Sequence, residues 1–500
     1  MTSRHREVEH TYDVEAAAEL PPLVDLPDVA SVGGPLRYRL EAHYFDTEDL
    51  ALGRRGITLR RRTGGNDDGW HLKLPVRGAR QEIHAPLGRT VTAPPIALRR
   101  IVQGVVREVP LGYVATVTTE RTIASLRDGD DALLAELCDD SVVATRAGDA
   151  GDEEHVWREW EVELHAAAPR LSKALRRLVR GAGAVPASGP SKLGRLMHLD
   201  ADASLASRPG IGPGASEHDL LSWHLVGLVA DLQRLDPMAR ADLPDAVHQL
   251  RLVVRRSRSA LRSFSACFDG AATEQLRDEL RWIGDVLGRP RDLEVLQEQL
   301  SELLMDQPRQ LVRGRMGTWM GARLRAQHRA AHQDVLVAMA SDRYFALVDA
   351  LEACATDPPW SERPDRKAST TLPKVLHREW RRVEKAVKEA DAADQRDRAE
   401  LLHRVRKKAK RVRYAAEALK PVLGAEARDT AATAKKVQRS LGAHHDAHVA
   451  IDHVLGLADA TYDDGRDTFT LGLLAARLEA ALATHDAAFR RTWKRARAHH

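Results

Sequence analysis

The sequence predicts a two-domain α+β chain, in which a β-rich domain precedes an all-α domain. Its 500 residues suffice for two or more domains of roughly 100–200 residues, each with its own core. Residues 1–199 consist mainly of short alternating runs separated by turn signals, whereas helical periodicity dominates residues 217–500. Between them, residues 200–216 are rich in Gly and Pro and have the composition of a linker.

The composition limits the class of protein. A hydrophobic fraction of 43% and charges of both signs exclude a wholly disordered chain. The sequence lacks an apolar run near the length of about 18 residues that a membrane span needs, so we expect no membrane partner. The first residues lack the apolar segment of a secretory signal, and the three cysteines are far apart in sequence. We therefore expect a reducing, cytoplasmic location.

Six runs of the first domain alternate polar and apolar residues, as strands of an antiparallel sheet do. They are residues 7–14, 37–45, 56–63, 70–76, 114–126 and 157–165. Asn66-Asp-Asp-Gly69 lies between two of these runs and predicts a hairpin turn. Residues 170–181 form the only segment of this domain with a strongly helical pattern.

Several of these runs carry charges of one sign on one face, because residues i and i+2 of a strand point the same way. The pairs are Glu7 with Glu9, Arg60 with Arg62, and Glu161 with Glu163. A half-solvated sheet accounts for such alternation. A closed sheet with a polar lumen accounts for it as well. In that lumen, carboxylates would hold divalent cations, and Arg and Lys side chains would bind phosphate oxygens.

Together the runs contain an ordered set of short motifs over about residues 5–198. In order they are Glu7-Val-Glu9, His43-Tyr-Phe-Asp-Thr47, Leu59-Arg-Arg-Arg62, Trp70-His-Leu-Lys-Leu-Pro75, Arg80-Gln-Glu82, Arg121, the stretch from Glu136 to Asp140, Glu161-Val-Glu163 and Ser191-Lys192. This set resembles the CYTH family, the triphosphate tunnel metalloenzymes. The resemblance implies an antiparallel β-tunnel, a closed barrel with flanking helices, that binds triphosphate compounds together with Mg²⁺ or Mn²⁺.

The resemblance also implies roles for the matched residues. Phosphate contacts would come from Arg60, Arg62, Lys73, Arg121 and Lys192. Metal ligands, or groups that orient the attacking water, would be Glu7, Glu9, Asp140, Glu161 and Glu163, with Glu7, Glu9 and Glu161 as candidate catalytic residues. Glu82 would be a further wall carboxylate, and Asp139 is an alternative to Asp140. The implied activity is divalent-metal-dependent hydrolysis of inorganic triphosphate or short polyphosphate.

One position departs from the family motif ExExK. Its lysine would fall at residue 11, where this chain has Thr11, and His10 points to the opposite face of the strand. Loss of one preorganised electrostatic donor slows an enzyme by roughly 10²–10³. The alternative function is therefore a non-catalytic polyphosphate-binding protein with a weakened tunnel.

The helical domain contains an internal repeat, with copies at about residues 217–355 and 374–495. Residues 248–258 align with residues 403–413, and residues 287–292 align with residues 441–446. On a helix the matched basic residues form one stripe in each copy. The stripes are His248, Arg251, Arg255 and Arg258 in the first copy, and His403, Arg406, Lys410 and Arg413 in the second. A repeated stripe favours binding of an extended polyanion over a merely solvated face.

This half resembles the CHAD family, an α-helical domain of two repeated four-helix units. The resemblance implies binding of inorganic polyphosphate by the eight stripe residues, and we expect mild acid to strengthen it by protonating the histidines. The order of the domains resembles the CYTH–CHAD architecture of inorganic triphosphatases. A nucleic-acid partner is disfavoured because the sequence has no base-reading motif or aromatic platform. His444 and His448, spaced i, i+4, raise the alternative of a transition metal, but no third ligand is evident.

Overall fold

The computed structural model describes residues 3–23, 25–76, 78–88, 91–148, 153–165, 168–199, 210–463, 465 and 467–498. The chain forms two compact units. One comprises Met1–Ser207 with Gln233–Leu243, and the other Arg208–Leu232 with Pro244–His500. We call them the barrel unit and the helical unit. Of the predicted linker, residues 200–209 lie outside the described residues.

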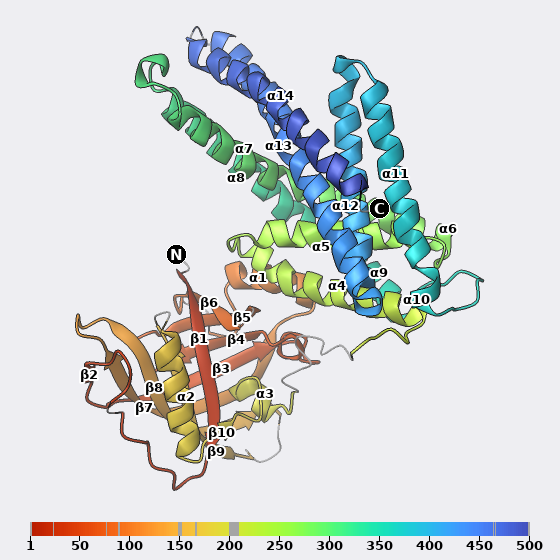
Figure 1. Ribbon diagram of the computed structural model, residues 1–500. Coiled ribbons are helices and arrows are strands. Elements are labelled where there is room, and N and C mark those ends of the chain that lie inside the picture. Colours follow the sequence, from red (N-terminus) through yellow and green to blue (C-terminus); the bar gives the residue numbers. More distant parts are fainter. Residues whose placement is uncertain are drawn as a thin grey trace. The chain divides into compact units, whose positions relative to one another are not determined.

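Eight antiparallel strands close into a ring in the barrel unit (Figure 1). Around the ring they follow the order β1, β6, β5, β4, β3, β7, β8, β9, and β9 pairs back onto β1. The predicted closed antiparallel barrel is confirmed. The strands are β1 (Ser3–Val14), β3 (Leu36–Asp46), β4 (Thr58–Thr63), β5 (Gly69–Val76), β6 (Ala79–Ala85), β7 (Gly112–Arg127), β8 (Leu133–Arg146) and β9 (His155–Leu164). The short strands β2 (Ser31–Val32) and β10 (Val185–Pro186) pair with β7 and β1.

The outer face of the barrel is apolar where helix α2 (Pro169–Gly181) covers it. Leu171, Leu175 and Val179 of α2 pack with Trp160 and Val162 of β9 in one buried cluster. Because successive residues of a strand point to opposite faces, this packing turns the intervening glutamates of β9 toward the lumen. The polar faces of the strands therefore enclose a cavity, and the half-solvated sheet is not the structure formed.

Several elements of this unit were not predicted from the sequence. Residues 170–181 do form α2, but they are not the only helix, because α1 (Ile96–Val106) and α3 (Lys192–Leu196) are helical too. Strand β8 escaped prediction because it buries residues on both faces, among them Leu134, Ala135 and Leu137, so its sequence does not alternate. Strand β6 is short and mostly polar, and its buried residues lie in its second half.

The described residues from 217 to 498 contain helices and loops, as predicted, and no strand longer than an isolated bridge. The helices are α4 (Glu217–Arg240), α5 (Ala246–Ser263), α6 (Gly270–Val286), α7 (Gly288–Met305), α8 (Met316–Met339), α9 (Asp342–Thr356), α10 (Ala368–Thr371), α11 (Pro373–Ala392), α12 (Gln395–Leu423), α13 (Ala425–Asp463) and α14 (Phe469–Arg497). None of the described helices is long and apolar enough to cross a membrane.

Two buried clusters join these helices. One connects α7 and α8 to α13 and α14 and includes Leu300, Leu324 and Leu471. The other connects α11, α12, α13 and α14 and includes Val383 and Val405. Helices α5 and α12, which carry the two repeated stripes, pack against each other. This packing brings the two copies of the basic motif to one place.

Candidate functional site

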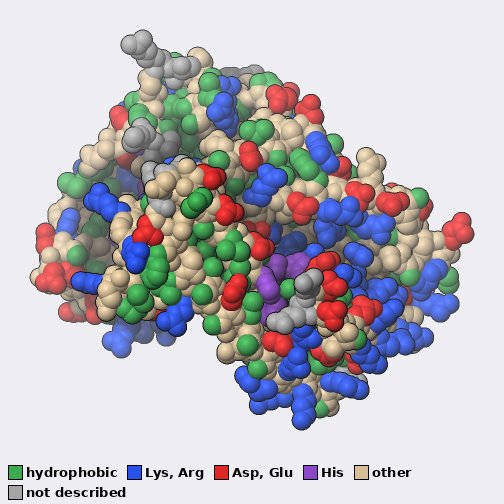
Figure 2. Space-filling model, turned by 90° about the horizontal axis from the view of Figure 1, so that it is seen from above, with side chains coloured by type: hydrophobic (Ala, Val, Ile, Leu, Met, Phe, Trp, Pro, Cys, Tyr) green, Lys and Arg blue, Asp and Glu red, His purple; other side chains and the backbone are tan. Residues whose placement is uncertain are grey.

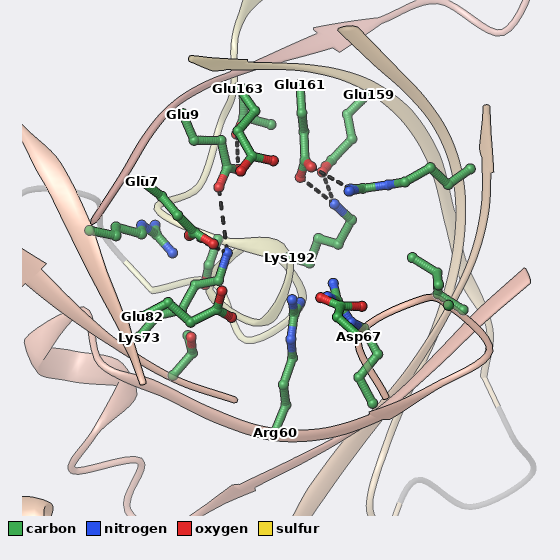
Figure 3. Close-up of a pocket in the computed structure, with 18 of the residues that line it drawn as sticks. Glu7, Glu9, Arg60, Asp67, Lys73, Glu82, Glu159, Glu161, Glu163 and Lys192 are labelled. Atoms are coloured by element: carbon green, nitrogen blue, oxygen red, sulfur yellow. Dashed lines mark hydrogen bonds and ion pairs between the residues drawn. The ribbon is translucent and has the colours of Figure 1, made fainter. Parts of the chain in front are cut away.

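The barrel lumen holds a cavity of about 300 Å³ with a strongly polar lining (Figure 3). Strand β1 contributes every second residue from His5 to Asp13, as its alternation requires. Ten residues singled out from the sequence line the cavity: Glu7, Glu9, Arg60, Arg62, Lys73, Glu82, Arg121, Glu161, Glu163 and Lys192. The structure thus gathers the predicted cations and carboxylates in one space.

Asp140, and not Asp139, lies on the lumen side of the wall. Its carboxylate accepts from Arg121 Nε at 2.7 Å and Nη2 at 2.6 Å, and it is fully buried. Asp139 instead pairs at 2.7 Å with Arg158, whose Nη1 also donates to the backbone of the segment after β1. Strand alternation separates the two neighbours, which sequence alone left as alternatives.

Lys192 is the centre of an acidic group on one side of the lumen. Its Nζ lies 2.9 Å from Asp140 Oδ2, 2.6 Å from Glu159 Oε1 and 2.5 Å from Glu161 Oε1. Burial alone would lower the pKa of Lys192, but these three carboxylates raise it well above its usual value. Helix α3 positions the lysine, and its N-cap Ser191 accepts a hydrogen bond from Gly194 N at 3.0 Å.

Lys73 is a second lumen lysine, and it lies beside the carboxylates of Glu7 and Glu9. Its Nζ lies 2.7 Å from Glu7 Oε2 and 3.7 Å from Glu9 Oε2 (Figure 3). Glu7 is buried next to Glu82, and burial, followed by the neighbouring carboxyl, raises the pKa of Glu7 to about 7. Thr11 also lines the lumen, opposite Glu161 in the closing β1–β9 pair, and His10 faces away as predicted.

Three sets of side chains each bring three ligand atoms within 4.8 Å of one another among the described residues. They are His5, Glu7 and Glu82; Glu136, Glu163 and His165; and Asp140, Glu159 and Glu161. Four of the five predicted metal ligands, Glu7, Asp140, Glu161 and Glu163, are divided among these sets, and the fifth, Glu9, belongs to none of them.

The residues present fit a hard divalent cation. Carboxylate oxygens are the ligands that Mg²⁺ and Mn²⁺ prefer. Burial is the largest cause that raises the pKa of Glu7, Glu159 and Glu163, which shows that the fold holds these carboxyls where a negative charge is costly. A bound cation would relieve that cost.

Arg60 and Arg62 project into the lumen from the opposite wall. Arg60 Nη1 donates to Tyr44 Oη at 3.2 Å, whereas Arg62 pairs with Asp67. Asp67 belongs to the turn between β4 and β5, where the hairpin was predicted. Gly64 makes this turn possible, since its φ is +96° and a Cβ would lie 1.9 Å from Arg39 O. The turn thereby supplies an internal counter-ion to a predicted phosphate-binding arginine.

Further polar lumen residues were not predicted from the sequence, among them His5, Asp67, Glu136 and Glu159. The alternation that identified Glu161 and Glu163 extends to Glu159, so the same pattern could have found it. Glu136 lies within a motif stretch that was noted only as a whole. The sequence carries no comparable signal for Asp67, because only the path of the turn brings it inward.

A second candidate site lies where α5 and α12 meet. We call Arg251, Arg255, Arg406 and Lys410 the seam cluster. Arg255 Nη2 donates to Tyr414 Oη of α12 at 3.2 Å, which ties the two helices together. Arg251 Nη1 lies 2.9 Å from Asp292 Oδ1, and Arg406 Nη2 lies 3.8 Å from Asp446 Oδ1.

These two ion pairs occupy equivalent positions in the two copies of the repeat. Asp292 and Asp446 are the final residues of the two aligned Leu-Gly segments, and each pairs with the leading arginine of its own copy. Gly288 leaves room for this arrangement, because a Cβ there would lie 2.9 Å from Arg251 Nη2. The repeat detected in the sequence is therefore a repeat of contacts as well.

The other predicted stripe residues do not all join the cluster. His248 has Arg251 and Arg255 among its charged neighbours. Arg258 instead has Arg281 and Asp285 of α6 near it. Arg413 donates to Gln438 Oε1 at 2.9 Å and pairs with Glu417.

Histidines border the cluster in the second copy. His403 Nδ1 and His445 Nδ1 are 3.0 Å apart, and Figure 2 shows a group of histidines beside Lys and Arg side chains at a hollow in the surface. Burial, followed by nearby cations, lowers the pKa of His403 to about 4 and of His445 to about 3. These low pKa values oppose protonation of His403 and His445 in the free protein, and stronger polyphosphate binding in mild acid stays a prediction.

The rings of His444 and His448 lie 4.8 Å apart, but the sets of three ligand atoms found among the described residues do not include them.

Comparison with known proteins agrees with this division. Residues 9–185 match the CYTH domain and residues 225–455 match the CHAD domain. An uncharacterized protein of Mycobacterium tuberculosis is 37% identical over 98% of both chains.

Two solved structures are similar to parts of this chain. PptA from Streptomyces chartreusis is 21% identical, with a TM-score of 0.46 over 56% of this chain and all of its own. A Hippeastrum protein, described as an adenylyl cyclase with a dominant triphosphatase activity, is 18% identical, with a TM-score of 0.25 over 39% of this chain and 95% of its own. On the domain matches and the full-length relative, the chain belongs to the family of proteins in which a CYTH domain precedes a CHAD domain.

Proposed function

We propose that the barrel unit hydrolyses inorganic triphosphate or a short polyphosphate with the help of Mg²⁺ or Mn²⁺. The observation that supports this is the lining of one lumen cavity by two kinds of group of opposite charge. Arg60 lies on one wall, and the crowded carboxylates of β1 and β9 lie on the other (Figure 3). Arg62, on the same strand as Arg60, lines the cavity as well. A chain of phosphates needs cations along its length, and its hydrolysis needs a site that positions water at a terminal phosphorus.

The lumen side chains have different roles in this reaction. Arg60, Arg62 and Arg121 bind nonbridging phosphate oxygens, and Lys73 and Lys192 neutralise charge closer to the carboxylates. Water attacks the terminal phosphorus, the anhydride P–O bond breaks, and the proton of the water passes to a lumen carboxylate. Glu7 suits this step, because a pKa of about 7 lies near a neutral working pH.

The carboxylate set Asp140, Glu159 and Glu161 would hold the divalent ion, which leaves Glu7 as the proton acceptor. When bound, the ion supplies charge neutralisation and acidifies its water.

Phosphate release from tripolyphosphate, ATP and long-chain polyphosphate, with Mg²⁺, with Mn²⁺ and with EDTA, tests this function. We expect metal-dependent release, fastest with tripolyphosphate. Glu7→Gln should abolish it without unfolding the barrel, whereas Glu41→Gln, an exposed glutamate on β3, should leave it unchanged. Equal turnover of wild type and Glu7→Gln would remove Glu7 from the mechanism.

The residue at position 11 favours a second function for the tunnel, which is binding of polyphosphate with slow turnover. Position 11 contributes a hydroxyl in place of a lysine, so the lumen has one cation fewer than the family motif supplies. A tunnel that binds polyphosphate but turns it over slowly fits that loss. Saturable binding of tripolyphosphate without metal-dependent phosphate release would identify this case.

For the helical unit we propose binding of inorganic polyphosphate at the seam cluster. Four cations from two packed helices face one region, with two aspartates paired there. Such an excess of positive charge suits a linear polyanion. Titration of the full chain with long-chain polyphosphate in EDTA should show binding that weakens steeply with salt. Double-stranded DNA at matched phosphate concentration should bind more weakly, and equal binding would favour a nucleic-acid function.

A further inference from the structure

The seam cluster contains one cation that can lose its charge. Where the first copy of the repeat has Arg255, the second has Lys410. The other members are Arg251 and Arg406, and a guanidinium stays protonated at any pH a protein tolerates. If four like charges repel one another, only the lysine can relieve the repulsion by releasing a proton.

The surroundings of Lys410 make that release favourable. Lys410 lies one helical turn after Arg406 and one turn before Tyr414, which accepts a hydrogen bond from Arg255 of α5, so its amine stands among the arginines of the seam. Burial, followed by the nearby Arg255, Arg406 and Arg251, lowers the pKa of Lys410 to about 6. The carboxylate of Asp446 on α13 acts in the opposite direction.

The remaining groups around the cluster do not reverse this effect. On α7, Asp292 pairs with Arg251, and Tyr414 on α12 accepts from Arg255. His403 and His445 have Lys410 among their charged neighbours, and their own low pKa values leave them neutral at pH 7. They therefore neither add positive charge nor act as counter-ions there.

We infer that polyphosphate binding at the seam cluster takes up a proton at Lys410, which is neutral in the free protein and becomes an ammonium when phosphate oxygens lie beside it. This inference rests on the proposed function of the helical unit. Phosphate oxygens supply the negative charge that the free cluster lacks, so they stabilise the protonated amine. The bound site then has four full cations, and the free site avoids their mutual repulsion.

Proton uptake at Lys410 makes the affinity for polyphosphate fall as pH rises. A ligand that raises the pKa of a group binds more weakly as pH rises through the range between the free and the bound pKa. Affinity should therefore be nearly constant below pH 6 and should fall above it, by at most about tenfold per pH unit for one proton. A site of permanently charged cations would show no such fall.

Calorimetric titration of the full chain with long-chain polyphosphate tests the inference. The titration is run in EDTA at pH 7.5, in two buffers of different ionisation enthalpy, so that the difference in heat counts the protons taken up. For wild type we expect uptake of roughly one proton per site. Lys410→Arg keeps the positive charge but cannot titrate, so it should bind with little or no uptake. Lys407→Arg, at an exposed position on the same helix, should behave as wild type.

Equal uptake by wild type and Lys410→Arg would overturn the inference while leaving polyphosphate binding intact, and so would an affinity of the wild type that does not change between pH 6 and pH 8. Absence of polyphosphate binding in both proteins would overturn the proposed function of the helical unit and, with it, this inference. Because the tunnel is the same in all variants, protons taken up there cancel in the comparison.

Discussion

Thr11 Oγ1 donates a hydrogen bond to Glu9 Oε1 at 3.1 Å, inside the barrel lumen. The hydroxyl therefore satisfies one carboxylate oxygen but brings no positive charge. Across the closing pair of strands, Thr11 lies opposite Glu161, whose own cations are Arg121 and Lys192. The wall between Glu9 and Glu161 is the place where the family motif has a lysine and this chain does not.

Thr11→Lys should raise metal-dependent triphosphatase activity, by about tenfold or more, because it restores a lumen cation between two carboxylates. Steady-state phosphate release from tripolyphosphate measures the effect. Thr11→Ser, which keeps the hydroxyl, should match wild type. A stable Thr11→Lys protein that is slower than wild type would show that Thr11 is compensated elsewhere in the lumen.

The neighbours Asp139 and Asp140 should differ sharply in their effect on stability. Asp140→Asn leaves Arg121 and Lys192 with one buried counter-ion fewer, and loss of one partner of a buried pair costs about 3 kcal/mol. Asp139→Asn affects a partly exposed pair with Arg158, worth about 1 kcal/mol or less. Scanning calorimetry of both variants measures the barrel transition. A larger loss of stability in Asp139→Asn would contradict the assignment of Asp140 to the lumen side.

Asp67→Asn should improve substrate binding, because the Asp67 carboxylate occupies Arg62, which we expect to bind phosphate. A phosphate chain must displace this carboxylate, and relief of a partly exposed pair of about 1 kcal/mol corresponds to roughly a fivefold lower KM. The turnover number should not change. Asp68→Asn, in the same turn, is the control, since the Asp68 carboxylate accepts from Gly65 N at 3.2 Å. An unchanged KM in Asp67→Asn would mean that Arg62 does not contact substrate.

Much of the barrel and its lumen could be predicted from sequence because strand alternation is a strict rule. It places Glu161 and Glu163 on one face, and knowing the parity of β8 would have chosen Asp140 over Asp139. Alternation fails for β8 as a whole, since its outer face and parts of its inner face are both buried. It also gives no information on Asp67, whose position depends on a glycine turn.

For the helical unit, the repeat predicted which residues matter but not how they meet. Helical periodicity placed Arg255 and Arg258 on one stripe, yet of the two only Arg255 has cations of α12 near it, whereas Arg258 lies near Arg281 and Asp285 of α6. Burial, followed by Arg255 and Arg251 of α5 together with Arg406, lowers the pKa of Lys410, and a single helix pattern contains neither the burial nor the partner helix. Predictions that depend on packing between the copies needed the structure.

Two double variants distinguish a shaped site at the seam cluster from a general basic surface. Arg251→Gln combined with Arg255→Gln should weaken binding of long-chain polyphosphate about 100-fold or more, since both guanidiniums belong to the seam cluster. The slope of log affinity against log salt should also fall by about two, one unit for each phosphate no longer neutralised. Lys385→Gln combined with Lys388→Gln removes the same charge from exposed positions on α11. That control should cost no more than about threefold, because exposed cations contribute only to the general field. Equal losses in the two double variants would show that net charge, and not the meeting of α5 and α12, governs binding.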